Sequence, residues 1–277
     1  MLRVLRVFDR RHSSGRPWFT IQGVATVSPA PPAAPPVPAR GAWNTVRSLL
    51  VTDPLIILST ILMGSVSLLV SLVDSSGRGQ HRVARGWSRM LLAVSGVRVR
   101  VQGLEKIAPD GSYVFAANHR SYMDIPAILP HIPVQFRFLA NRNLFNVPFI
   151  GYHLRRAGHL PVNNANPRES LRTMSDAARA IRQRGISALV FPEGGRTYGE
   201  LGEFKEGAAY IAIKAGVPIV PMAMTGLREV LPRGSGVVNR GRVELLIGNP
   251  IPTVGFSLQD RARLTQQLRE AMAALLA

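Results

Sequence analysis

Short apolar runs bounded by Gly, Pro or Asn recur along the chain from residue 97 onward. Runs of this kind are typical of strands buried in a sheet, and the first of them alternates apolar residues with arginine, as a half-exposed strand does. The predicted strands are 97–101, 113–117, 136–140, 188–191, 219–224 and 243–247.

Helical patterns fall between these strands. Asn166 is the clearest helix start, because proline follows at the first helical position and glutamate at the third, and Gly185 ends that helix. Two more helices are predicted at 204–215 and at 257–275. Strands that alternate with helices predict an α/β fold, with a mixed sheet covered by helices. We expect residues 96–277 to form this domain.

An uncharged stretch of nineteen residues, 55–73, is close in length to the roughly 20 residues that a membrane-spanning helix needs. Gly64 and five Ser or Thr residues dilute this stretch, so a shallow insertion and a buried soluble helix are alternatives. Four arginines follow within residues 78–89, whereas Arg47 is the nearest base before it. This asymmetry predicts that the C-terminal domain lies on the cytoplasmic side of an inner membrane.

Residues 81–95 predict an amphipathic helix, because apolar residues such as Trp87 recur at helical spacing and arginines lie on another face. A basic face with a tryptophan suits an anionic membrane surface, and a charged face above an ordinary core contact is the alternative. We expect 43–95 to be a membrane-associated helical segment. The Arg- and Pro-rich residues 1–42 predict a disordered tail, although an Arg-rich, acid-poor start also resembles an organelle transit peptide.

Two polar turns after apolar strands carry the candidate chemistry. In the first, Asn118 and His119 directly follow a predicted strand, and Asp124 lies five residues beyond the histidine. An imidazole, with a reference pKa of about 6.5, accepts a proton from a hydroxyl near neutral pH, and a carboxylate fixes its tautomer. Because a five-residue offset does not stack on a regular helix, the segment must turn, with Asn118 as the expected cap.

The second turn follows the strand predicted at 188–191. It contains Glu193, Gly194, Gly195, Arg196 and Thr197. The glycines permit unusual backbone angles and close approach of a ligand, and Arg196 suits a phosphate, while Glu193 suits a substrate hydroxyl or the orientation of Arg196. Two such turns predict one shared site at the rim of the sheet. A tight turn with a surface ion pair is the alternative.

The composition limits the nucleophiles that the protein itself can supply to the reaction. The chain has no cysteine and no serine in a nucleophile-elbow arrangement. The histidine is therefore expected to activate a hydroxyl of the substrate itself, without a covalent intermediate on the protein. No pair among the other five histidines forms a metal-ligand spacing with carboxylates, so no metal site is expected.

The chain is strongly basic, with 34 Lys and Arg against 16 Asp and Glu, a net charge of +18. Such a charge attracts polyanions, although a genome rich in GC, which favours arginine, explains the excess equally well. No zinc pattern or basic patch with interleaved aromatic residues is present, and much of the charge lies near the apolar stretch. Membrane lipid is therefore the expected partner, and nucleic acid is not.

Several segments, taken in order, resemble the glycerolipid acyltransferase family, the enzymes of the lysophosphatidic acid type. The resemblance covers about residues 85–250. It includes the block at 118–124, which reads asparagine, histidine, four residues and aspartate, and the Phe-Pro-Glu-Gly block that begins at Phe191. The other similar segments are 144–151, 204–207 and 217–221.

This resemblance implies transfer of a fatty acyl group from an acyl-CoA or acyl-carrier-protein thioester to the free hydroxyl of a lysolipid such as 1-acylglycerol-3-phosphate. No cofactor is implied besides the acyl donor. His119 would act as general base and Asp124 would orient it, with backbone amides near Gly194 and Gly195 as candidate donors to the oxyanion. The arginines that could serve a phosphate are Arg120, Arg142 and Arg196.

The chain departs from the family pattern at three positions. Asn164 stands where the second block has arginine, Asn141 where a lysine often precedes the Leu-Phe pair, and Gly195 where many members have threonine. With fewer cations for an acceptor phosphate, an aminolipid or glycolipid acceptor is an alternative, as is an ester or thioester hydrolase. The intact His119 and Asp124 argue against a non-catalytic lipid-binding protein.

Removal of residues 1–42 is expected to leave acyl transfer unchanged, because neither candidate turn draws on the tail. The measurement compares turnover by the truncated and full-length proteins at equal concentration. A large loss of activity on truncation would contradict this expectation.

Overall fold

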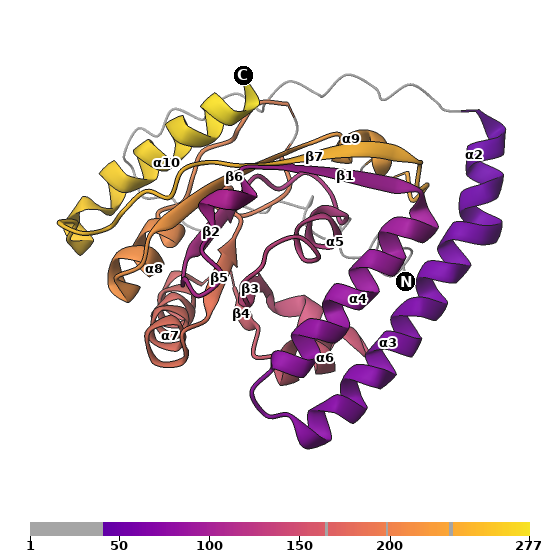
Figure 1. Ribbon diagram of the computed structural model, residues 1–277, viewed down its shortest axis with the longest axis horizontal. Helices are drawn as coiled ribbons and strands as arrows, with labels where there is room; N and C mark the ends of the chain where they lie inside the picture. The colour runs from indigo at the N-terminus through magenta and orange to yellow at the C-terminus, as the bar shows by residue number, and fades with distance from the viewer. Residues whose placement is uncertain (1–40, 164–165, 198, 233–234) are drawn as a thin grey trace, which may run out of the picture.

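A seven-stranded mixed sheet forms the centre of the computed structural model, which describes residues 41–163, 166–197, 199–232 and 235–277 (Figure 1). Its order is β1-β7-β6-β2-β5-β3-β4, and neighbouring strands are parallel except for β6 and β7. The strands are β1 Val97–Gln102, β2 Val114–Ala117, β3 Phe136–Asn141, β4 Leu160–Val162, β5 Ser187–Val190, β6 Ile219–Thr225 and β7 Gly241–Ile247. The predicted α/β fold is confirmed; the predicted tail lies, up to residue 40, outside the described residues.

Helices cover both faces of this sheet. α7, α8 and α10 pack on one face, and α4 and α5 pack on the other (Figure 1). The helices are α2 Ala42–Arg47, α3 Asp53–Val73, α4 Arg78–Ser95, α5 Asp124–Ile128, α6 Ile150–Arg156, α7 Pro167–Arg184, α8 Gly207–Ala215, α9 Leu227–Val230 and α10 Arg261–Leu276. The shorter helical turns are η1 Ser48–Thr52, η2 Leu104–Lys106, η3 Arg142–Asn146 and η4 Leu258–Asp260. The domain thus has three layers, with an apolar core on each side of the sheet.

Alternation of side chains along β2 divides the core into these two halves. Val114 and Ala116 contribute to the core beneath α7, α8 and α10, whereas Phe115 and Ala117 contribute to the core beneath α4 and α5. All four side chains are fully buried, which is why this strand is a continuous apolar run. β2 pairs with β5 on one side and with β6 on the other, so the residue that follows it leaves the middle of the sheet.

The predicted helices and strands are present, several with shifted ends. Asn166 caps α7 by accepting a hydrogen bond from the Glu169 main-chain N–H at 3.2 Å, and Gly185 ends this helix in the left-handed conformation, at φ 59°. α8 begins at Gly207 and not at residue 204. β4 is missing from the predicted strands, because three residues are too few to produce a periodic pattern.

Most of the polar residues of α3 face the protein. Those that are buried are Ser59, Thr60, Ser67 and Ser71. The Trp87 indole of α4 donates to Thr60 Oγ1 at 3.2 Å, and Ser67 Oγ lies 2.7 Å from Nδ1 of His153 in α6. Trp87 is therefore held against α3. For the helix predicted at 81–95, this contact corresponds to the alternative in which the apolar face packs against the protein.

The opposite face of α3 is apolar and exposed. Leu58, Leu62, Leu69 and Leu72 are each more than half exposed. Within the described residues, one helical stretch, Ala42–Val73, is long and apolar enough to cross a membrane by length and composition, and 22% of its apolar window is buried inside the protein. A helix that covers a soluble core has the reverse arrangement, with its apolar face inward. An exposed apolar face of this kind marks a contact with lipid or with another protein.

The buried side chain of His81, in α4, makes the stability of the folded protein depend on pH. His81 packs edge-on against Phe136, with ring centroids 5.2 Å apart. Burial lowers the pKa of His81 to about 3, and the nearby charge of Arg137 acts in the same direction. An unfolded histidine titrates near pH 6.5, so the unfolded chain binds more protons than the folded protein between these two values.

Stability is therefore expected to fall as the pH decreases below about 6.5, with His81 contributing up to about 1.4 kcal/mol per pH unit. His81→Leu should remove that share of the slope, because leucine does not titrate. The measurement is the free energy of unfolding in urea at several pH values between about 7.5 and 5. Equal slopes in the variant and in the wild-type protein would show that His81 is not responsible.

Candidate active site

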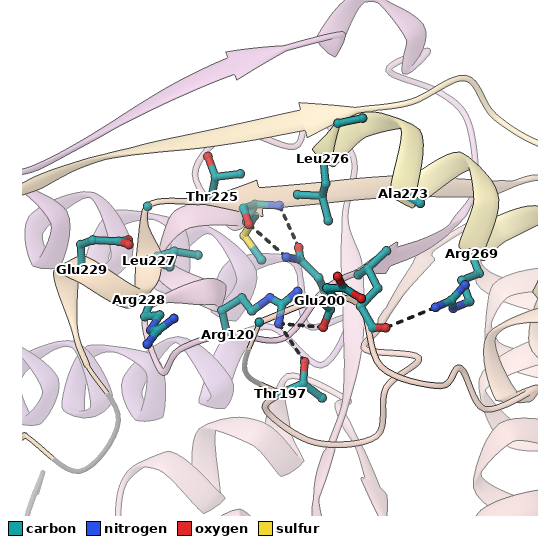
Figure 2. A pocket seen from close by; sticks show the side chains of 16 residues that line it. Arg120, Thr197, Glu200, Thr225, Leu227, Arg228, Glu229, Arg269, Ala273 and Leu276 are labelled. Atoms are coloured by element: carbon teal, nitrogen blue, oxygen red, sulfur yellow. Dashed lines mark hydrogen bonds between the residues drawn. The ribbon is translucent and has the colours of Figure 1, made fainter. Parts of the chain in front are cut away.

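The two candidate turns meet at one edge of the sheet. β2 and β5 are adjacent and parallel, so their carboxyl ends, which lead into His119 and Glu193, lie side by side. A cavity of about 620 Å³ adjoins them, with Asn118, Arg120 and Thr197 among its lining residues (Figure 2). Ligands of open α/β sheets bind at the carboxyl ends of the strands, so this edge is where a site is expected.

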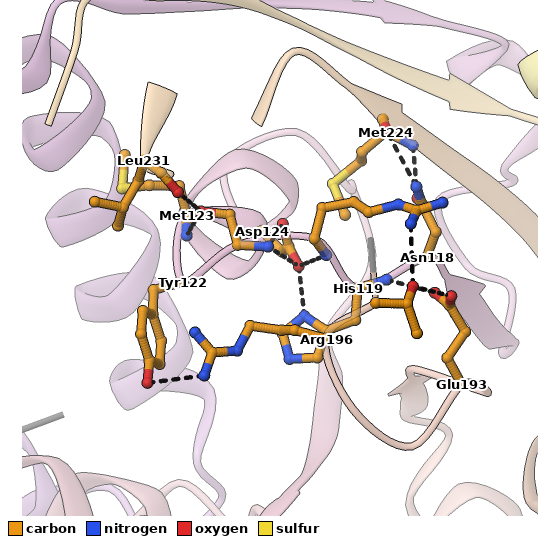
Figure 3. Close-up of polar contacts among 12 residues, drawn as sticks. Asn118, His119, Tyr122, Met123, Asp124, Glu193, Arg196, Met224 and Leu231 are labelled. Carbon is orange, nitrogen blue, oxygen red and sulfur yellow. Dashed lines mark hydrogen bonds and ion pairs between the residues drawn. The ribbon is translucent and has the colours of Figure 1, made fainter. Parts of the chain in front are cut away.

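His119 and Asp124 form a direct pair at this edge (Figure 3). Nδ1 of His119 lies 2.5 Å from Oδ2 of Asp124; the aspartate side chain is fully buried, whereas the imidazole is 24% exposed. With a proton on Nδ1, the ring donates to the carboxylate and presents Nε2 as a proton acceptor. The structure therefore brings together the two residues that the sequence assigned as base and orienting acid.

Main-chain amides hold the Asp124 carboxylate in place. The Arg120 N–H donates to it at 2.9 Å, and the Ser121 N–H lies within 3.0 and 3.1 Å of its two oxygens. These contacts need a tight turn after His119, and Asp124 is itself the first residue of α5. A buried carboxylate requires such donors to replace its lost contacts with water, and they also fix its direction toward the imidazole.

The prediction that Asn118 caps the following helix is wrong. Its buried side chain pairs with the main chain of Met224 in β6: Nδ2 donates to the carbonyl oxygen at 3.0 Å, and Oδ1 accepts from the N–H at 2.8 Å. Through this double contact, the Asn118 side chain takes the place of a backbone pair between β2 and β6, just beyond the point where the β2 backbone leaves the sheet. Asn118 thereby determines where the chain leaves the sheet toward His119.

Phe191 supports the imidazole from the second turn. The rings of His119 and Phe191 stack with centroids 4.2 Å apart and an interplanar angle of 19°. Together with the contact to Asp124, this stacking restrains rotation of the imidazole. The sequence contains no local signal for the stacking, because it arises only when β5 pairs with β2.

Glu193 braces the two turns against each other. Its buried carboxylate accepts hydrogen bonds from the His119 main-chain N–H at 2.9 Å, from the Gly202 N–H at 3.1 Å and from the Thr197 hydroxyl. Both carboxylate oxygens are thereby engaged with the protein. The structure does not support the expectation that Glu193 holds a substrate hydroxyl or orients Arg196.

Thr197 connects the hydrogen bonds of Glu193 to Arg120. Its N–H donates to the His119 carbonyl oxygen at 3.0 Å, while its hydroxyl donates to Glu193 and accepts from Arg120 Nη1 at 3.0 Å. Arg120 is thereby held at the wall of the cavity (Figure 2). One threonine thus joins the histidine turn, the buried glutamate and a cation.

The two other predicted phosphate ligands have different partners. Arg196 stacks over the Tyr122 ring at 3.8 Å and donates to its hydroxyl at 3.0 Å (Figure 3). Arg142 follows β3, two strands from β2, and forms an ion pair with Glu169 at 2.6 Å. A strand spacing of about 4.8 Å puts Arg142 roughly 10 Å along the edge from the histidine turn. Asn164, a departure from the family pattern, lies outside the described residues.

Gly194 and Gly195 differ in the space around them and in whether their main-chain N–H is available to a ligand. Gly194 has φ 70°, and a Cβ there would lie 2.7 Å from the side chain of Lys205. The N–H of Gly194 donates to the Phe191 carbonyl oxygen at 3.0 Å, inside the turn. A Cβ on Gly195 would meet nothing within 4 Å, and its N–H has no hydrogen-bond partner in the described part of the chain. Of the two expected oxyanion donors, Gly195 has the available amide.

Comparisons with known proteins bear on the fold and on the family. A family model described as Acyltransferase matches residues 98–225. The crystal structure of the 1-acyl-sn-glycerophosphate (LPA) acyltransferase PlsC from Thermotoga maritima is similar, with a TM-score of 0.71 at 25% identity, over 84% of this chain and 96% of that chain. Residues 98–225 thus match an acyltransferase family, and the chain is similar to proteins named 1-acylglycerol-3-phosphate acyltransferases. The resemblance predicted from the sequence motifs is confirmed.

Relatives within this acyltransferase family come from distant organisms. A chloroplastic 1-acyl-sn-glycerol-3-phosphate acyltransferase of Brassica napus is 33% identical over 174 residues, which are 62% of this chain and 50% of that protein. The alpha form of 1-acyl-sn-glycerol-3-phosphate acyltransferase of Homo sapiens is 28% identical over 178 residues, 64% of this chain and 63% of that protein. The chain thus spans about half the length of the plant relatives that it matches.

Replacing Thr197 with valine is expected to lower the free energy of unfolding by about 1–3 kcal/mol, because the buried Glu193 carboxylate loses a donor. Arg120 would lose its hydroxyl partner as well. Thr197→Ser, which keeps the hydroxyl, is the matched control and should stay within about 1 kcal/mol of the wild-type protein. Denaturant unfolding measures both variants, and equal losses would contradict a role for the hydroxyl.

Proposed function

We propose that the protein transfers a fatty acyl group from a thioester of coenzyme A or acyl-carrier protein to the free hydroxyl of a lysophospholipid, 1-acylglycerol-3-phosphate. The proposal depends on the 2.5 Å contact of His119 with Asp124 at the carboxyl edge of the sheet. The acceptor follows from what the relatives are named for. No cofactor is proposed, because a thioester is already activated toward acyl transfer.

The pair supplies general-base catalysis. Nε2 of His119 removes the proton from the acceptor hydroxyl as its oxygen forms a bond to the thioester carbonyl carbon. The carbonyl electrons move to the oxygen, toward which the Gly195 N–H is available as a donor. Collapse of this intermediate breaks the carbon–sulfur bond, and the imidazolium returns its proton to the departing thiolate. Asp124 stabilises the imidazolium between these two steps.

Arg196, stacked on Tyr122, is proposed to bind the acceptor phosphate. A guanidinium binds phosphate through a planar pair of donors, and the ring beneath it restrains the arginine. Arg142, farther along the edge, is already paired with Glu169, so Arg196 is the principal candidate. Because Asn141 and Asn164 replace cations that are common in the family, the acceptor is best identified with a panel of phosphorylated and unphosphorylated lysolipids.

Association with a membrane fits both the acceptor and the outward apolar face of α3. The lipid acceptor resides in a bilayer, and leucines of α3 remain exposed to it while the polar side chains of this helix bond to the domain. Arginines after α3 outnumber those before it, which favours the cytoplasmic side of an inner membrane for the domain.

His119→Ala is expected to lower kcat by about 10²–10⁴-fold, because it removes the base. Asp124→Asn should also lower kcat strongly, since the amide no longer stabilises the imidazolium. Asp176→Asn, which alters an exposed carboxylate paired with Arg179 on α7, is the control and should retain activity. Full activity in folded His119→Ala protein would refute the assignment of the base.

The assay supplies labelled acyl-CoA and acyl–acyl-carrier protein with the lysolipid panel, and mass spectrometry identifies the product. A diacyl product supports acyl transfer and names the acceptor. Free fatty acid as the sole labelled product would show that water is the acceptor and that the protein is a hydrolase.

A further inference from the structure

The cavity of about 620 Å³ beside the histidine turn has no role in the mechanism described so far. It lies between the carboxyl end of β6, the start of α9, the loop after Thr197 and the last turns of α10 (Figure 2). Asn118, Arg120 and Thr197 contribute to its wall, so it reaches the immediate neighbours of His119. Its volume is within the range of about 300–1,000 Å³ that small-molecule sites occupy.

Charged residues in the wall favour an anionic ligand. Arg120, Arg228 and Arg269 line the cavity, together with Glu200 and Glu229. Both glutamates and Arg269 are exposed, whereas Arg120 and Arg228 are half-buried, so the charges of these two arginines are the least screened by solvent. The guanidinium of Arg120 bonds to two neutral groups, the Thr197 hydroxyl and the Glu200 carbonyl oxygen.

Apolar side chains form the rest of the wall, with Met224, Leu227 and Leu276 among them. A lining that combines apolar surface with a few arginines suits a ligand that carries phosphates on an organic framework. A bare inorganic anion would leave that apolar surface unused. The lining therefore matches a phosphorylated organic molecule of moderate size.

The position of the cavity distinguishes the two substrates. α3 packs against α4, and its C-terminal half packs against α6, which follows β3, whereas Ser48 at the N-terminal end of the same helical stretch bonds to Val238 beyond α9. The cavity lies at β6 and α10, on the flank of the histidine turn opposite β3. In Figure 1, α3 and α10 are on opposite sides of the molecule. A lipid acceptor that enters from a membrane along the C-terminal half of α3 would approach from the β3 flank, where Arg142 lies. The β6 flank is then left to the water-soluble part of the acyl donor.

Direct transfer without an acyl-protein intermediate requires both substrates at His119 together. We infer that this cavity binds the phosphate-bearing coenzyme A portion of the acyl donor, with Arg228 and Arg269 as ligands of its phosphates and Arg120 nearest the reacting thioester. The inference depends on the proposed function for the identity of the donor. It assigns the donor to the β6 flank and the acceptor phosphate to the flank of Arg196 and Arg142.

The test separates the two substrates kinetically. Arg269→Gln and Arg228→Gln should each raise KM for palmitoyl-CoA by about tenfold, because one charge-assisted contact is lost, and leave KM for 1-acylglycerol-3-phosphate unchanged. Arg179→Gln, an exposed arginine of α7, is the matched control and should change neither constant. A rise in KM for the acceptor alone, or no change in either constant, would overturn the inference.

A binding measurement separates this inference from the proposed reaction. Calorimetry with free coenzyme A on the full-length protein should show binding that Arg269→Gln weakens about tenfold and Arg179→Gln does not change. 3′-Dephospho-coenzyme A should bind more weakly than coenzyme A to the wild-type protein. If coenzyme A binds in this way but no acyl transfer occurs, the site is supported and the proposed reaction fails. If acyl–acyl-carrier protein alone supports transfer and coenzyme A does not bind, the site assignment fails and the reaction is supported.

Discussion

The contact between His119 and Asp124 is the constraint on which the site depends, and three neighbouring strands cooperate to make it. β2 delivers the histidine, Asn118 anchors the end of β2 to β6, and Glu193 after β5 accepts the His119 main-chain N–H. The aspartate is aimed by main-chain donors of the turn itself. The turn that contains His119 is thus held from both strands that flank β2, which fixes the direction in which Nε2 of the imidazole points.

The same rule, that buried polar groups need partners, explains the orientation of α3. Two of its hydroxyls, those of Thr60 and Ser67, bond to Trp87 of α4 and to His153 of α6, so the helix is fixed to the domain through its polar side. Its leucines are left on the outside, where water makes them unfavourable and hydrocarbon does not. The contacts that attach the helix to the domain and the apolar surface that it exposes therefore lie on opposite faces of one element.

This arrangement gives the sheet edge that carries His119 two unlike sides. The β3 side adjoins the helical layer that contains α3 and α6, and the β6 side adjoins the cavity lined by arginines from α9 and α10. The proposed reaction joins a lipid to a water-soluble donor in one step, and such a division suits it because neither substrate has to leave before the other arrives.

Local pattern determined much of this protein: the apolar strands, the Asn166 cap, the uncharged helix, and a base and acid five residues apart. These features depend on neighbours in the chain, so they can be predicted from the sequence. Only the tertiary structure decided the roles of Asn118 and Glu193, whose partners lie 106 and 74 residues away. It likewise decided which face of α3 is buried and where the cavity opens. Strand order sets such contacts, and strand order is a property of the whole sheet.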